Sequence, residues 1–259
     1  MKKIGITGGI GSGKTTLCKV AESMYIPVFY TDDVSKGIIK NNYLVKHYII
    51  KNFGNDSYFD DGTPNSKHLA NILFNDDSEM ELLSQQIKPI LLERMYEWFY
   101  EQEKKNKVIV FVESAIMLNS DFSDTHLDSV VSVLADTDIR VDRVLKRDTH
   151  RTREDVLNIL TKQLSNEEMI DRSSLSVYNN NCTESDLKNI IDELKSVFIY
   201  NIGSLEDRRF DYIIKNKDNI RKVDTQEDFV NDITAIIQRE DYATAMEIIK
   251  KKYSIIKMK

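Results

Sequence analysis

Five of the nine glycines of this 259-residue chain lie within its first thirteen positions. The segment Ile4–Thr16 contains the spacing G-x-x-x-x-G-K-[ST], which runs from Gly8 to Thr15. Glycine has no Cβ, so consecutive backbone N–H groups of such a loop can point to one side and bind an anion. The segment therefore predicts a phosphate-binding loop (P-loop) that holds a nucleoside triphosphate.

The neighbouring residues fit this prediction. Lys3–Thr7 has the pattern of a short buried strand, and apolar residues with helical spacing follow the loop at Leu17, Val20, Ala21 and Met24. Lys14 is expected near the β- and γ-phosphates, and the hydroxyl of Thr15 is expected to bind Mg²⁺. The predicted ATP contacts in this segment are Gly9, Ile10, Gly11, Ser12, Gly13, Lys14, Thr15 and Thr16.

Composition limits the remaining possibilities. The 36 basic and 42 acidic residues leave a formal net charge of −6, so we expect no nucleic-acid partner and a local basic cluster for any anion. Cys18 and Cys182 are the only cysteines, which predicts neither a disulfide framework nor a cysteine metal site and favours a reduced, cytoplasmic setting. We expect no signal peptide, because the glycine-rich loop begins so early, and no membrane-spanning segment, because every apolar run is too short.

Three further apolar runs, at 26–30, 108–112 and 130–134, have the pattern of central strands of a parallel sheet buried on both faces. Helical stretches alternate with them. The predicted fold class is therefore α/β, a P-loop NTPase-type parallel β-sheet flanked by helices, with its chemistry at the carboxyl ends of the strands.

Two long segments interrupt this alternation. Residues 36–106 read as helical, with helices expected at 43–53, 66–74 and 79–103, and form either a subdomain for the second substrate or a purely structural excursion. Residues 138–154 contain six Lys or Arg among seventeen positions. They predict a lid over the nucleotide at about 138–170; the alternative is a solvated helix face.

Phosphoryl transfer to a hydroxyl also needs a carboxylate that orients the acceptor and takes its proton. The run 26–30 leads into Thr31-Asp32-Asp33 and is expected to neighbour the P-loop strand. Asp32 is the preferred catalytic residue, whereas Asp33 could equally serve as a helix N-cap or first-turn acid. Glu113, which directly follows the run 108–112, could hold the metal through water or support the loop.

Taken together, these residues resemble the dephospho-CoA kinase family, which transfers the γ-phosphate of ATP to the ribose 3′-hydroxyl of dephospho-CoA. The resemblance covers about residues 1–197 and is carried first by Thr7–Thr16, which reads like that family's P-loop. It implies Asp32 as the catalytic base. Tyr30 stands where the family has a first Asp, and Lys36 stands where it has an Arg, which keeps the charge but loses the planar fork of donors.

The resemblance continues through the helical segment, at Phe53-Gly54, Asp61-Gly62, Leu69–Phe74 and Lys88-Pro89, with Lys67 beside Ser66 where the family often has Arg. It implies acceptor-binding roles for Asp32, Lys36, Lys67, Lys88 and Glu113. In the lid, Arg143, Lys146-Arg147-Asp148, Thr152-Arg153-Glu154 and Gln163 fall in family register. Arg147 is the implied catalytic arginine that contacts the transferring phosphates.

The carboxyl end leaves two alternatives. Val177-Tyr178-Asn179 stands where the family has a strand ending in an Asn beside adenine, so Asn179 is an expected ATP contact. Residues 209–216 are a better strand by composition and would instead bring Asn216 to the base, with 165–208 as an enlarged lid. We favour Asn179, a kinase core over 1–200 and an extension over 201–259 that packs a strand and helices on the core. The basic and apolar stretch 246–259 is expected to be a packed terminal helix rather than a membrane or partner contact.

The leading hypothesis is thus Mg²⁺-dependent phosphorylation of dephospho-CoA by ATP, in which Lys14, Asp32 and Arg147 are catalytic and Thr15 is the metal ligand. The expected partners are these two small molecules, with no nucleic acid and no membrane, and the chain is expected to be a monomer or a small homo-oligomer. A nucleoside or deoxynucleoside monophosphate kinase on the same scaffold is the alternative enzyme. A non-catalytic ATP-binding module is the alternative from another class.

Overall fold

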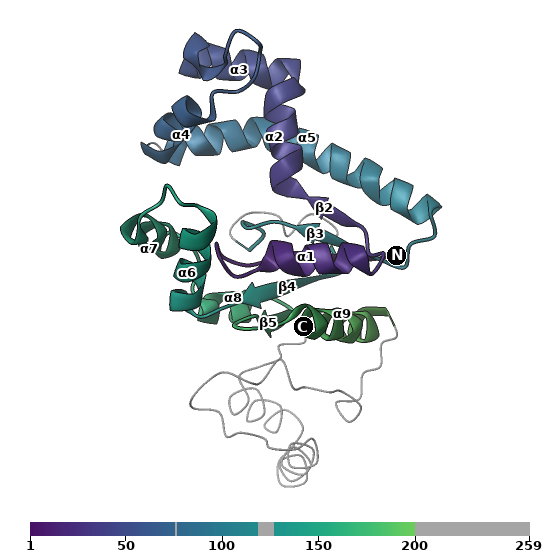
Figure 1. Ribbon diagram of the computed structural model, residues 1–259. Helices are drawn as coiled ribbons and strands as arrows, with labels where there is room; N and C mark the ends of the chain where they lie inside the picture. The colour runs from purple at the N-terminus through teal and green to yellow at the C-terminus, as the bar shows by residue number, and fades with distance from the viewer. Residues whose placement is uncertain (76, 119–126, 200–259) are drawn as a thin grey trace, which may run out of the picture. The chain divides into compact units, whose positions relative to one another are not determined.

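A five-stranded sheet with the order β2-β3-β1-β4-β5 organises the computed structural model, which describes residues 1–75, 77–118 and 127–199 (Figure 1). The strands are β1 (Lys2–Thr7), β2 (Val28–Tyr30), β3 (Ile109–Glu113), β4 (Ser129–Leu134) and β5 (Leu175–Tyr178). The described residues divide into two compact units, one of residues 1–28 and 107 onward, the other of residues 29–106. The α/β class with a parallel sheet is confirmed.

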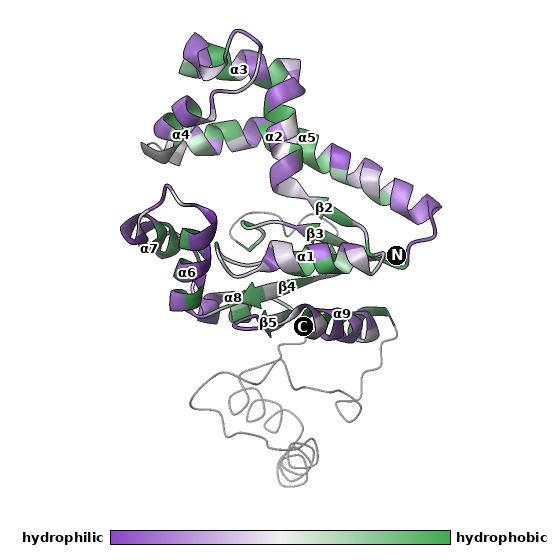
Figure 2. Cartoon of the chain, in the orientation of Figure 1, coloured by the Kyte–Doolittle hydropathy of each residue, from purple (hydrophilic) through white to green (hydrophobic). Residues whose placement is uncertain are grey.

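The sheet is parallel in the three pairings around its centre. Ile4 of β1 lies opposite Phe111 of β3, Ile6 lies opposite Val131 of β4, and Val133 of β4 lies opposite Val177 of β5. All five residues of β3 are buried, as expected for a strand covered on both faces. The continuous apolar runs in the sequence reflect this double coverage, and Figure 2 shows β3 mainly in the green of hydrophobic residues.

One expectation about the sheet was wrong. The strand at β2 is the edge strand of the sheet order rather than a central one, and β3 separates it from the P-loop strand β1. Only three residues form β2, and only the middle one, Phe29, is fully buried. An apolar run reports burial but not strand order, so it could not show that the chain returns after residue 106 to place β3 between the two.

Five helices of the first unit accompany the strands: α1 (Lys14–Ser23), α6 (Thr137–Arg147), α7 (Arg153–Thr161), α8 (Asn166–Arg172) and α9 (Glu184–Ile199). The apolar stripe of α1 is buried through Leu17, Cys18, Val20 and Ala21, which confirms the helix predicted after the loop. Both α7 and α8 begin with a capping box, Thr152 with Asp155 and Ser165 with Glu168, so their starting points are fixed by sequence.

The second unit is helical, as predicted. It contains α2 (Thr31–Asn41), α3 (Tyr43–Phe53), the short 3₁₀ turn η1 (Asn55–Ser57), α4 (Ser66–Asn75) and α5 (Asp77–Lys104). Buried residues such as Ile38, Ile49 and Met95 form its interior, and the rings of Phe29 and Trp98 pack with their centroids 5.4 Å apart. The unit therefore has an apolar core of its own.

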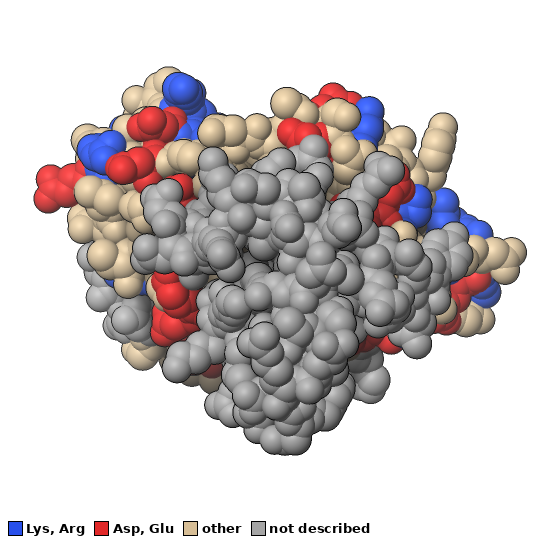
Figure 3. Space-filling model, turned by 90° about the horizontal axis from the view of Figure 1, so that it is seen from below, with Lys and Arg blue, Asp and Glu red and all other residues tan. Residues whose placement is uncertain are grey.

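Surface charge agrees with the composition. In the face shown in Figure 3, acidic and basic side chains of the described residues are interspersed rather than separated by sign.

Within the described ranges, no helix is long and apolar enough to span a membrane. The strand expected at 209–216, the helices expected in the extension 201–259, the terminal stretch 246–259 and Asn216 lie outside the residues that the structure describes.

Two glycines of the second unit provide a matched stability test. Gly54 follows α3 with φ +86° and ψ 167°, and Gly37 lies within α2; a Cβ at either would meet nothing within 4 Å. We expect Gly54→Ala to lower the free energy of unfolding by roughly 1–2 kcal/mol, because the backbone conformation disfavours a side chain. Gly37→Ala should instead raise it by up to about 1 kcal/mol through helix propensity. Urea denaturation followed by circular dichroism measures both, and equal effects of the two variants would contradict the argument.

Candidate active site

The P-loop lies between β1 and α1, and it is shaped by close approach of the polypeptide around it. Gly13 is the N-cap of α1 with φ +92° and ψ 15°, and a Cβ on it would overlap Nδ2 of Asn179. Only glycine combines this conformation with this contact. The first turn of α1 contains no acidic residue, so the positive end of the helix dipole faces the loop without a counter-charge from its own helix.

Three consecutive carbonyl groups of the loop accept hydrogen bonds from side chains far along the chain. The bonds are Arg140 Nε to Ile10 O at 2.9 Å, Arg143 Nη1 to Gly11 O at 3.3 Å and Asn179 Nδ2 to Ser12 O at 3.0 Å. Both arginines come from α6, and Asn179 directly follows β5. The side of the loop that carries its carbonyl oxygens is therefore held by two elements of the same unit.

This arrangement directs the amides of the loop to its other side. The C=O and the N–H of one planar peptide point in opposite directions, so the bonds at Ile10 O and Ser12 O turn the N–H groups of Gly11 and Gly13 inward. Such a set of convergent N–H groups binds anions. Within the described residues, the hydroxyl Oγ of Ser12 is buried without a hydrogen-bond partner. The loop thus combines inward donors with a spare hydroxyl, which suits a phosphate chain.

A buried carboxylate lies beside the loop. Glu113 is the last residue of β3, stands opposite Ile6 in the strand register and is 4% exposed. Its Oε1 is 3.6 Å from Nζ of Lys14 and 3.4 Å from Oγ1 of Thr15, which donates to it. A hydroxyl and a carboxylate are the oxygen ligands that Mg²⁺ prefers, so these residues fit the ion.

The thiol of Cys18 lies in the same unit and is chemically quiet. Burial raises its pKa, and the negative charge of Glu113 raises it further. A buried thiol with a raised pKa is a poor nucleophile and a poor metal ligand at neutral pH. The chemistry of the site therefore falls to oxygen and nitrogen groups.

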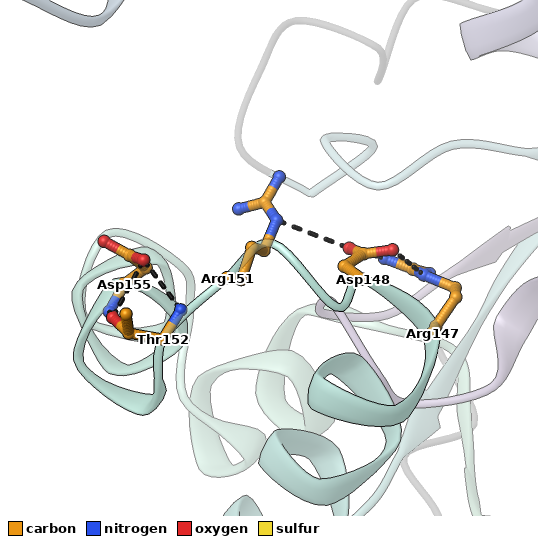
Figure 4. Close-up of polar contacts among 5 residues, drawn as sticks. All are labelled: Arg147, Asp148, Arg151, Thr152 and Asp155. Carbon is orange, nitrogen blue, oxygen red and sulfur yellow. Dashed lines mark hydrogen bonds and ion pairs between the residues drawn. The ribbon is translucent and has the colours of Figure 1, made fainter.

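At the end of α6 and in the turn after it, the arginines make a different kind of contact. Arg147 donates from Nε and Nη2 to the two carboxylate oxygens of Asp148, each at 2.8 Å, and Arg151 Nε lies 3.3 Å from the same carboxylate (Figure 4). The hydrogen bond from Arg147 holds the pKa of Asp148 below its usual range, and the same bond raises that of Arg147. Arg147 is 62% exposed, so its guanidinium is displayed at the surface with one carboxylate as its partner.

Two residues near the loop were not singled out by the sequence. Arg140 is 6% exposed, and Asn180, which is also buried, accepts from Arg143 through its backbone carbonyl at 2.7 Å. The amide side chain of Asn180 pairs with Asp136 in both directions, at 2.9 Å. Arg140 lies next to the buried Val141 on α6 and one turn before Val144, so its place on the apolar side of the helix was the signal that could have identified it.

Asn179 lies beside the P-loop, and its expected contact with adenine stays a prediction. The strand that precedes it is β5, which pairs with β4, so the interpretation of 165–208 as an enlarged lid is wrong. Asn179 is 3% exposed, and its Nδ2 donates a hydrogen bond to Ser12 O of the loop. The structure therefore assigns the Asn179 amide to support of the P-loop.

The other candidate residues belong to the helical unit. Asp32 and Asp33 occupy the first turn of α2, where their negative charge suits the helix dipole, and Asp32 is exposed. Lys36 pairs with Asp33 at 3.2 Å with both side chains largely exposed. Lys67 is exposed in the first turn of α4, and Lys88 is half-buried in α5 directly before Pro89.

Comparison with known proteins identifies one family. A family model described as dephospho-CoA kinase matches residues 2–186. A dephospho-CoA kinase of Bacteroides fragilis is 32% identical over 177 residues, which cover 68% of this chain and 84% of that protein. One from Salinibacter ruber is 32% identical over 194 residues, covering 75% and 96%.

Solved structures with a similar fold are also found. A crystal structure of a protein from Thermus thermophilus shares 26% identity and superposes with a TM-score of 0.64, over 76% of this chain and 97% of that one. A dephospho-CoA kinase from Campylobacter jejuni shares the fold, with a TM-score of 0.58, 20% identity and coverage of 78% and 100%.

The bond between Asn179 and the loop leads to a prediction about the protein without nucleotide. Asn179→Ala should lower the free energy of unfolding by roughly 1–2 kcal/mol, because Ser12 O loses the shorter of its two hydrogen bonds and keeps only that from Arg143 Nη1 at 3.4 Å. Asn179→Asp should cost more, since it sets a carboxylate against that carbonyl. Thermal unfolding of both variants, with Asn158→Ala as a surface control, tests this. If only the affinity for ATP changed and the unfolding curves did not, Asn179 would contact the nucleotide instead.

Proposed function

This chain belongs to the dephospho-CoA kinase family, and we propose that it transfers the γ-phosphoryl group of ATP to the ribose 3′-hydroxyl of dephospho-CoA, yielding coenzyme A. The observation that carries the donor half of the proposal is the P-loop, whose carbonyl groups are held from outside so that its amides converge. Phosphoryl transfer depends mainly on positioning and on electrostatic stabilisation, and this loop is built for both.

On the donor side, Lys14 and the loop amides hold the β- and γ-phosphates. Thr15 and Glu113 would hold Mg²⁺, which when bound neutralises charge that develops on the phosphates. Glu113 is buried against Lys14 and Thr15, so we assign it to this side of the reaction rather than to acceptor binding. The negative charge of Glu113 holds the ammonium group of Lys14 beside the loop before the nucleotide binds.

On the acceptor side, we assign to Asp32 the orientation and deprotonation of the 3′-hydroxyl. It is an exposed carboxylate in the first turn of α2. Dephospho-CoA carries a diphosphate, for which Lys36, Lys67 and Lys88 are the cations we propose in the helical unit. Arg147 is the arginine that we propose for the transferring group, and its bidentate contact with Asp148 supports this, since the same fork of donors suits a phosphate.

The setting follows from the family and the composition. Both cysteines are free thiols, as expected in a reducing compartment, and we propose a cytoplasmic enzyme that acts as a monomer or a small homo-oligomer. Its proposed partners are ATP, Mg²⁺ and dephospho-CoA.

The direct test uses the purified full-length chain with ATP, Mg²⁺ and dephospho-CoA. ADP release should depend on dephospho-CoA and stop when EDTA removes the metal, and mass spectrometry should find one added phosphate on the acceptor. Nucleoside and deoxynucleoside monophosphates serve as competing acceptors. Turnover of those compounds with none of dephospho-CoA would contradict the proposal, and ATP binding without any phosphorylated product would reduce the chain to a binding module.

Replacement of Asp32 separates catalysis from binding. Asp32→Asn removes the proton acceptor and keeps the shape, so kcat should fall by roughly 10²–10⁴-fold while the Kd for ATP changes less than about threefold. Asp33→Asn is the matched control, because it removes a neighbouring carboxylate whose observed partner is Lys36. Steady-state kinetics and calorimetry measure the two quantities. A larger loss of kcat in Asp33→Asn would assign the base to Asp33.

A further inference from the structure

Ile10 of the P-loop is held through its amide, its carbonyl and its side chain at once. Its N–H donates to Oε1 of Gln163 at 3.0 Å, and its C=O accepts from Nε of Arg140 at 2.9 Å. Arg140 Nη2 in turn donates to the same Oε1 of Gln163 at 2.8 Å. The three residues therefore close a ring of hydrogen bonds around Ile10, which fixes the two successive peptide units on either side of its Cα.

The side chain of Ile10 completes the attachment. It packs against a cluster of buried residues, Val141 and Val144 of α6 and Val156 of α7, together with the half-buried Leu145 and Leu160. Gln163 follows the end of α7. These contacts of Ile10 come from α6, α7 and Gln163, two residues beyond the end of α7, within the segment expected to form the lid.

From this geometry we propose that Arg140 and Gln163 are positioning residues that anchor the P-loop to α6 and α7 through Ile10, so that nucleotide affinity depends on this lid segment. The inference rests on the proposed function only in its choice of nucleotide. Neither side chain needs to touch a phosphate. Arg140 fixes the Ile10–Gly11 peptide and, because that peptide is planar, the direction of the Gly11 N–H. Gln163 fixes the preceding Gly9–Ile10 peptide and also accepts from Arg140.

The chemistry of arginine is what this place requires. Arg140 is buried, and burial lowers the pKa of its guanidinium. The hydrogen bonds of the guanidinium must therefore offset the free energy that its desolvation costs. Its Nε and Nη2 reach two oxygens in fixed directions, which a lysine ammonium on a flexible stem cannot reproduce together. The guanidinium also lies directly against Gly9, where a Cβ would overlap Nη2. A buried cation at this distance from the loop adds to the potential that attracts phosphate.

Calorimetric titration of the full-length chain with MgADP tests the proposal, because ADP binds without an acceptor. Arg140→Met should weaken the affinity roughly 10- to 100-fold, since a charged hydrogen-bond donor to the loop is lost. Gln163→Met should weaken it in the same direction, and the double variant should be no weaker than Arg140→Met by more than about twofold, because the two residues form one ring. Arg140→Lys should recover only part of the loss.

Arg172→Met is the charge-matched control, since Arg172 is an exposed arginine of α8 that contacts Leu118 O at 3.5 Å. It should bind MgADP within about twofold of the unmodified chain. In steady-state assays Arg140→Met should raise the KM for ATP and leave the KM for dephospho-CoA unchanged, which a general loss of stability would not do. Should Arg140→Met fail to fold, Gln163→Met carries the test alone.

Three results would overturn the inference: MgADP affinity within threefold of the unmodified chain in both methionine variants, additive losses in the double variant, or full affinity in Arg140→Lys. If the unmodified chain binds MgADP but does not phosphorylate dephospho-CoA, the proposed function fails while the titrations still decide the role of Arg140 and Gln163.

Discussion

The hydrogen bonds to the carbonyl groups of Ile10, Gly11 and Ser12 are the interactions on which the site depends. A glycine-rich loop is free to adopt the shape that phosphate requires, but the same freedom makes that shape costly in entropy. Donors that come from residues at 140, 143 and 179 remove this cost before the nucleotide arrives. The loop therefore supplies the geometry and the distant side chains supply its rigidity, which explains why a segment of a few residues needs α6 and β5 to work.

The sheet performs the equivalent task for the charged groups. Parallel register sets Glu113 opposite Ile6, close to where β1 leads into the loop, and burial there forces the carboxylate to find a cation. Lys14 and the hydroxyl of Thr15 meet that need from the first turn of α1. Lys14 is thus positioned by a strand that is more than ninety residues away in sequence, because the strand order places β3 directly beside β1.

The sequence predicted the elements better than their arrangement. Local patterns are sufficient for β1, α1 and the helices α3, α4 and α5, because periodicity and the glycine spacing report local structure. The edge position of β2 and the use of the Asn179 amide depend on contacts between distant segments, and no local pattern encodes these. Arg140 was hidden in a run of charged residues, where only its neighbours Val141 and Val144 indicated the buried side of α6.

The same run shows how an acidic protein can bind a highly charged anion. Arg140 and Arg143 face the loop and donate hydrogen bonds to its carbonyl oxygens. Arg147 and Arg151 instead both contact the carboxylate of Asp148. The first pair fixes the loop and adds positive potential behind it. The second pair shares one carboxylate, that of Asp148. One helix and the turn after it therefore concentrate positive charge beside the P-loop, and a net charge of −6 over the whole chain does not prevent this, since screening limits the reach of the remaining acidic groups to about 10 Å.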